Sequence, residues 1–102
     1  MLAGADYEIK EVEDGKRALA AVAKARPDLI LMGIQLPIMD GYEVTRRIKA
    51  DPAMRSIPII AVTSHALAGE EQTARAAGCD AYVPEPYSPR LLLAKIQQCM
   101  RR

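Results

Sequence analysis

The sequence predicts an α/β protein built on a doubly wound parallel sheet. Short apolar stretches alternate with stretches of helical periodicity along the whole chain, and only short loops separate them. Because crossovers between parallel strands are right-handed, we expect helices on both faces of the sheet. The chain has 102 residues, enough for one hydrophobic core, so we expect a single domain over residues 1–102.

The first half of the chain contains two predicted strands and two predicted helices. Residues 7–12 alternate between apolar and charged side chains, as in a strand with one exposed face. A helix over 15–25 follows, since apolar residues recur along one side of it, and Pro27 ends it. The apolar run 28–32 is typical of a strand buried on both faces. The helix 41–50 then places Val and Ile inward and Arg and Lys outward.

The second half repeats this alternation. Residues 57–63 form another apolar run and therefore a buried strand. A helix over 66–77 comes next, and Gly78 is expected just beyond its end in the left-handed conformation. Residues 80–83 form a short last strand. The final helix begins at Pro89, because proline suits the first position of a helix.

Composition excludes several classes of function. With 14 Lys and Arg against 13 Asp and Glu, the net charge is +1, so there is no general attraction to nucleic acid or to a membrane surface. No apolar run approaches the roughly 18 residues of a membrane span. The sequence does not open with the pattern of a signal peptide, so we expect a cytoplasmic protein. The spacing of Cys79 and Cys99 favours buried free thiols over a disulfide or a metal pair.

The carboxyl edge of such a sheet is where ligands and chemistry gather. Gly33 ends the second predicted strand, Thr63 ends the third, and Glu85 follows the fourth between two prolines. The Thr63 hydroxyl either donates to an anion or caps the next helix, and Glu85 is either a rigidly mounted functional charge or an exposed loop acid. No glycine-rich phosphate-binding motif occurs, which argues against nucleotide binding. The single histidine, His65, has no nucleophile placed beside it, so we expect it to face solvent.

The segments around these residues resemble the receiver domains of two-component response regulators, especially single-domain regulators of the cell-division type. The matching stretches are DLILMGIQLPIMDGYEVTRRIK, IPIIAVTSHA and GCDAYVPEPYSP, and the similarity runs through residues 1–102. The resemblance implies the flavodoxin-like receiver fold and a signalling role. In this family, an Asp at the end of the third strand accepts phosphate from a histidine kinase, and an acidic pair after the first strand helps to hold Mg²⁺. A Ser or Thr ending the fourth strand and a Lys after the fifth contact the phosphoryl oxygens.

The chain departs from this family pattern at every charged position. Gly33 stands where the acceptor Asp is expected, and Glu85 stands where the Lys is expected. By the same comparison the family's first strand and most of its first helix are absent, and the acidic pair with them. The residues that match the pattern are Thr63, the Gln35 carbonyl, Tyr82 and Pro86. Tyr82 corresponds to an aromatic that swings inward in the family, or is simply a half-buried strand side chain. We therefore expect no bound Mg²⁺, no metal site and no other cofactor.

These departures predict a receiver-like signalling domain that is not phosphorylated, is not an enzyme and acts through protein–protein interaction. Its partner is then a histidine kinase, another signalling protein or a second copy of the chain. The alternative is a truncated or mutated form of an active, phosphate-accepting response regulator. A weaker alternative is a small-ligand binder that uses the space left at the carboxyl edge by Gly33.

The absent strand has a structural consequence. In the family it lies between the second and third strands, so without it residues 7–12 and 28–33 would each have an unpaired edge, and such edges attract other strands. Three outcomes are open. Two chains form a homodimer through these edges, or the two strands pair directly with each other, or the protein is only marginally stable. We favour the first two and expect a homodimer.

Overall fold

The computed structural model describes residues 8–12, 15–34, 41–63 and 69–100. Within them, four strands alternate with four helices, as the sequence predicts. In chain order the elements are β1 (Ile9–Val12), α1 (Gly15–Ala25), β2 (Leu29–Gly33), α2 (Gly41–Ala50), β3 (Ile59–Thr63), α3 (Glu70–Ala77), β4 (Ala81–Pro84) and α4 (Pro89–Met100). No helix among these is long and apolar enough to cross a membrane.

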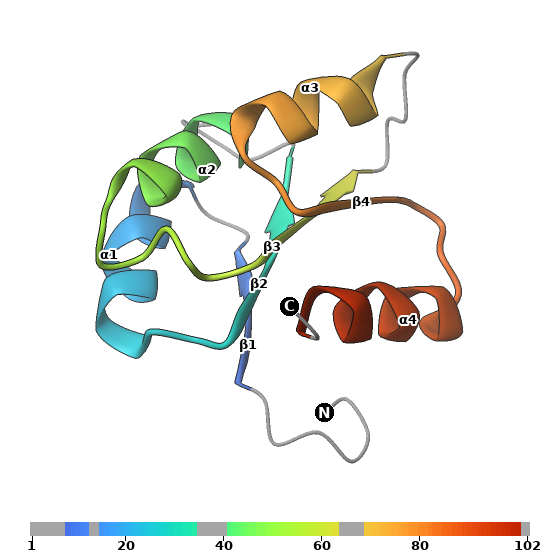
Figure 1. The fold of residues 1–102 in the computed structure, drawn as a ribbon, viewed down its shortest axis with the longest axis horizontal. Coiled ribbons are helices and arrows are strands. Elements are labelled where there is room, and N and C mark those ends of the chain that lie inside the picture. Colours follow the sequence, from blue (N-terminus) through green and yellow to red (C-terminus); the bar gives the residue numbers. More distant parts are fainter. Residues whose placement is uncertain (1–7, 13–14, 35–40, 64–68, 101–102) are drawn as a thin grey trace.

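The sheet has the order β1-β2-β3-β4, and all three neighbouring pairs are parallel. Helices α1, α2 and α3 lie on one face of the sheet and α4 lies on the other (Figure 1). The chain is therefore an α/β protein with the doubly wound, flavodoxin-like architecture.

Strand β2 shows why these residues form a central strand. Ile30 and Met32 belong to the core between the sheet and α1, α2 and α3, whereas Leu29 and Leu31 belong to the core under α4. All four side chains are buried, because successive residues of a strand point to opposite faces and both faces are covered. Burying one such side chain stabilises the fold by about 1.5–3 kcal/mol.

Strand β1 pairs directly with β2, in a register that places Ile9 beside Leu29 and Val12 beside Met32. Of the three outcomes considered for these strands, direct pairing is the one that the structure has, and the expected unpaired edges between them are wrong. The physical reason is that main-chain groups of a buried strand must find partners, and the nearest parallel strand supplies them. The homodimer itself stays a prediction, although these two edges no longer support it.

The four predicted strands and the start of the third helix differ from the observed elements by one to four residues. The third strand begins at Ile59 and not at residue 57, because Ile57 is held in a turn by a 3.0 Å hydrogen bond from its N–H to the Met54 carbonyl. Pro58 has no N–H to give to a ladder, although its carbonyl accepts a hydrogen bond from Ile30. Helix α3 begins at Glu70 and not at residue 66, because its N-cap Gly69 has a left-handed φ of 82°, which lies outside the α-helical range. Residues 64–68, including His65, lie outside the described residues.

Lys49 joins three elements at the amino edge of the sheet. Its Nζ donates to the carbonyl oxygens of Arg55 at 3.1 Å and Ile57 at 2.8 Å, and it forms a 3.0 Å ion pair with Oδ2 of Asp80. The same Oδ2 accepts a hydrogen bond of 2.9 Å from the N–H of Ile59. The end of α2, the segment before β3 and the residue before β4 are thus fastened together at one point.

Gly78 ends α3 in the left-handed conformation, as predicted, with φ of 113°. A Cβ at this position would also lie 2.8 Å from Cγ of Lys49, so glycine is needed both for the turn and for the close approach to α2. The two cysteines, Cys79 and Cys99, are buried and free, which confirms that interpretation.

Candidate functional site

Three strands deliver the predicted site residues to one edge of the sheet. Gly33 ends β2, Thr63 ends β3, and Glu85 follows the last residue of β4. The register places Gly33 beside Val62 and Thr63 beside Pro84. The N–H of Glu85 donates to the Thr63 carbonyl at 2.6 Å, which fixes where the loop after β4 leaves the sheet.

A cleft of about 180 Å³ opens at this edge. It brings together Gly33 and Glu85, which the sequence predicts at the acceptor and lysine positions of the receiver pattern. We call it the carboxyl-edge cleft, and the described residues that line it are Glu11, Val12, Leu31, Gly33, Val62, Glu85 and Tyr87.

Two of these lining residues, Glu11 and Tyr87, were not singled out from the sequence. Glu11 enters the cleft because β1 pairs directly with β2, so the end of β1 lies next to Gly33. The alternation along residues 7–12 predicts a strand that contains Glu11, but it does not predict which strand lies beside it. Tyr87 comes from the loop that leads to α4, and a loop position gives no periodic signal.

The charge of the carboxyl-edge cleft is negative. Glu11 and Glu85 contribute the ionisable acids, and no Lys or Arg is among the described lining residues. Such a cleft disfavours an anion, because the carboxylates repel it and no cation among the described lining residues offsets its charge.

The site offers little to a magnesium ion. Among the described residues, no group of three or more His, Cys, Asp and Glu side chains is arranged to hold a metal. Mg²⁺ demands near-octahedral oxygen coordination, usually from carboxylates together with water and phosphate oxygens. Gly33 contributes no carboxylate to the cleft, so the residues described here do not fit the ion. The Gln35 carbonyl, which the family pattern includes, lies outside the described residues.

Gly41 explains how the loop after β2 returns to the site. Its N–H donates to the Ile34 carbonyl at 3.0 Å, so α2 starts directly beside the end of β2. A Cβ on residue 41 would collide with the Gly33 carbonyl oxygen and lie 3.0 Å from Cα of Ile34. The glycine of the predicted loop is therefore needed for a close approach of two backbone segments.

Thr63 and Tyr82 occupy neighbouring strands but do not line the cleft. Thr63 is buried, with 1% of its surface exposed. Tyr82 is 9% exposed, and its hydroxyl donates to Oε1 of Glu70 at 3.2 Å. Burial raises the pKa of Tyr82, and the hydrogen bond to Glu70 raises it further. The Tyr82 side chain thus ties β4 to α3. Pro86 follows Glu85 through a cis peptide bond.

The four parallel strands and the helices on both faces of the sheet have the flavodoxin-like architecture of receiver domains. The chain belongs to the response regulator receiver domain family, whose model matches residues 1–97.

Among curated proteins, the chain is 44% identical over 93 residues to the polar-differentiation response regulator DivK of Brucella anthropi, covering 90% of this chain and 76% of that protein. It is 43% identical to DivK of Brucella ovis over the same length.

Solved receiver domains share the fold. The receiver domain of the sensor histidine kinase PA1611 from Pseudomonas aeruginosa PAO1, which has a magnesium ion in its active-site cleft, superposes with a TM-score of 0.85 at 30% identity, covering 96% of this chain and 100% of that one. The BeF3-activated receiver domain of Klebsiella pneumoniae RstA gives a TM-score of 0.77 at 27% identity, covering 89% and 75%.

Proposed function

We propose that this receiver domain does not accept a phosphoryl group and acts by binding other proteins of a two-component pathway. The observation that carries the proposal is the carboxyl-edge cleft, in which Gly33 and Glu85 lie together. An acyl phosphate forms only on a carboxylate nucleophile, and Gly33 has no side chain. The loss of this one group removes the reaction whatever else remains.

The electrostatics of the cleft support the same proposal. Phosphoryl transfer depends on metal ions and cations that neutralise charge on the transferred group. Here the ionisable groups that line the cleft are Glu11 and Glu85, which repel that charge. The domain is then no enzyme, and it holds no Mg²⁺ at this edge.

The proposal is tested by phosphotransfer from a small phosphodonor. The purified chain is incubated with acetyl phosphate and Mg²⁺, and intact-mass spectrometry follows any phosphoryl adduct. We expect no adduct on the wild-type chain. Gly33→Asp restores a carboxylate nucleophile, and Gly33→Asn is the uncharged control of similar size. We expect neither variant to gain an adduct, because Glu85 and Glu11 remain in the cleft and repel the phosphoryl group. A hydroxylamine-sensitive adduct on the wild-type chain overturns the proposal.

The partners follow from the family. We propose a histidine kinase or another signalling protein of the pathway as the partner, or a second copy of the chain, in the cytoplasm and without nucleic acid or membrane. The alternative is a truncated or mutated form of an active phosphate-accepting regulator. Coding sequence upstream of Met1 that continues in frame and encodes a strand ending in two acids would support this alternative.

A further inference from the structure

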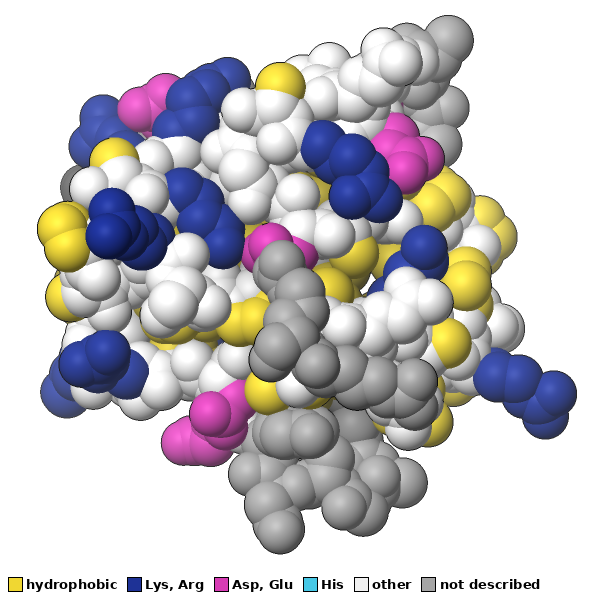
Figure 2. Space-filling view, in the orientation of Figure 1, with side chains coloured by type: hydrophobic (Ala, Val, Ile, Leu, Met, Phe, Trp, Pro, Cys, Tyr) yellow, Lys and Arg dark blue, Asp and Glu magenta, His cyan; other side chains and the backbone are white. Residues whose placement is uncertain are grey.

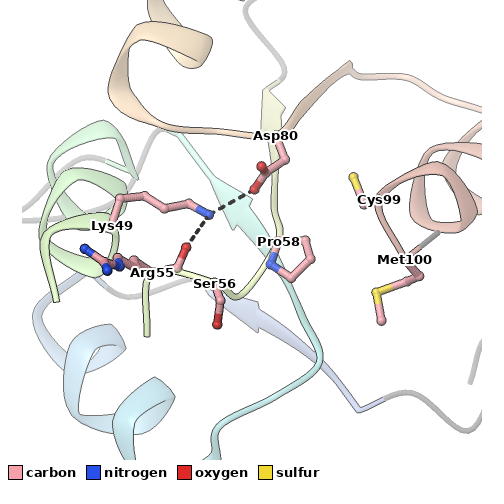
Figure 3. Close-up of a pocket in the computed structure, with 7 residues that line it drawn as sticks. All are labelled: Lys49, Arg55, Ser56, Pro58, Asp80, Cys99 and Met100. Carbon is pink, nitrogen blue, oxygen red and sulfur yellow. Dashed lines mark hydrogen bonds and ion pairs between the residues drawn. The ribbon is translucent and has the colours of Figure 1, made fainter. Parts of the chain in front are cut away.

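A second concave region lies at the opposite, amino edge of the sheet, away from the carboxyl-edge cleft. A cavity of about 430 Å³ lies between the segment that precedes β3 and the end of α4 (Figure 3). A smaller cavity of about 120 Å³ adjoins it and shares Asp80 and Cys99. We call the two together the amino-edge groove, and its described lining is Lys49, Arg55, Ser56, Pro58, Arg75, Asp80, Ala81, Lys95, Gln98, Cys99 and Met100.

Positive charge dominates this groove. Its lining contains four cationic side chains and one carboxylate, that of Asp80. Lys49 neutralises Asp80 through the 3.0 Å ion pair that Figure 3 shows, and Arg75 pairs with Glu71 at 3.2 Å. The lining therefore retains a net positive charge after its internal pairs are formed.

Arg55 and Lys95 supply that charge. Neither side chain forms an ion pair or a side-chain hydrogen bond within the part of the chain that the structure describes. Arg55 lines the larger cavity and Lys95 the smaller one, and the two cavities share Asp80 and Cys99. Figure 2 shows further Lys and Arg side chains over α1, α2, α3 and α4 on this face, which add long-range attraction for an anion.

The shape of the groove indicates what kind of anion fits. Two cations in separate, adjoining cavities match two negative charges that are spaced along a chain. Cys99 and Met100 add apolar surface to the lining of the groove, and Ser56 and Gln98 add hydrogen-bonding groups for a backbone.

We propose that the amino-edge groove binds an extended acidic segment of a partner protein, with carboxylates at Arg55 and Lys95. Charge complementarity of this kind sets the orientation and the association rate of a complex. The groove lies at the other end of the strands from Gly33 and Glu85, so its binding does not depend on whether the carboxyl-edge cleft accepts phosphate.

The test uses a fluorescein-labelled peptide of alternating Glu and Ala, and the same peptide with Gln in place of Glu. Fluorescence anisotropy measures binding to the full chain, and amide shifts in NMR spectra locate it. We expect the Glu peptide to bind, the Gln peptide not to bind, and added salt to weaken the complex. Arg55→Glu with Lys95→Glu should reduce affinity about tenfold or more, since each reversal replaces an attraction by a repulsion.

Arg90→Glu is the matched control. Arg90 and Lys95 are both cations on α4. Arg90 is exposed and, unlike Lys95, does not line the groove. We expect it to change affinity less than about twofold, and thermal melts should show all variants folded. Equal binding by the double variant and the wild type overturns the proposal.

Two further results would also overturn it. In the first, inorganic phosphate alone shifts the groove amides and displaces the peptide, which indicates a small-anion site. In the second, the molar mass of the chain rises with concentration and the double variant abolishes the rise, which indicates a second copy as occupant.

Discussion

Lys49→Met removes the cation that joins α2 to the segments before β3 and β4, and we expect it to destabilise the fold. Lys49 and Asp80 have side-chain exposures of only 20% and 15%, and Lys49 also satisfies the carbonyls of Arg55 and Ile57. Removing one partner of a buried ion pair costs about 3–5 kcal/mol. Because water reaches part of this pair, and also the exposed Arg55 backbone, we expect a loss of about 2–3 kcal/mol.

The assay is urea unfolding followed by circular dichroism, together with a thermal melt. For a chain of this length, the expected loss lowers the melting temperature by about 10–20 °C. Lys24→Met is the control, because Lys24 is exposed on α1 and has no ion pair among the described residues; it should stay within about 0.5 kcal/mol of the wild type. A Lys49→Met loss no larger than that of the control would refute the reasoning.

Two other predictions concern a glycine and a thiol. Gly41→Ala should destabilise the chain by about 1–3 kcal/mol in the same urea assay, since its Cβ collides with the Gly33 carbonyl. Burial raises the pKa of Cys79 above its ordinary 9.0, and burial with the Glu70 hydrogen bond raises that of Tyr82 above 10.0. As pH rises, the unfolded chain loses these two protons before the folded chain does. The contribution of the two groups to the free energy of unfolding should therefore be constant below pH 9.0, and it should decrease as the pH rises above the ordinary pKa values of the two groups. Cys79→Ala should reduce the earlier part of this fall, and an unchanged pH profile would contradict the assignment.

The order and type of every described element were predictable from the sequence. The apolar runs that became β2 and β3 are buried on both faces, which only a sheet covered on both sides allows. Gly78 was predictable because a helix end followed by a glycine favours the left-handed conformation. The start of β3 was missed by two residues, since the apolar Ile57 and Pro58 continue the pattern of the strand while their main-chain groups serve a turn and a neighbouring strand.

The position of β1 was not predictable in the same way. Periodicity says that residues near Ile9 form a strand, but it carries no information about the neighbouring strand. The family's strand order left three arrangements open, and the contact between β1 and β2 resolves them. The same contact brings Glu11 to the carboxyl-edge cleft, which is why the sequence indicated only one acid there, Glu85.

The two edges of the sheet differ in charge, and this difference bears on how such a domain recognises a partner. The net charge is only +1, so the total charge gives little attraction to any partner. Glu11 and Glu85 line the cleft at one edge, whereas Arg55 and Lys95 line the groove at the other. A partner with charge of one sign is therefore attracted to one edge and repelled by the other, which fixes its orientation. Recognition of this kind requires no phosphoryl group, so it is compatible with the proposed absence of an acceptor carboxylate at Gly33.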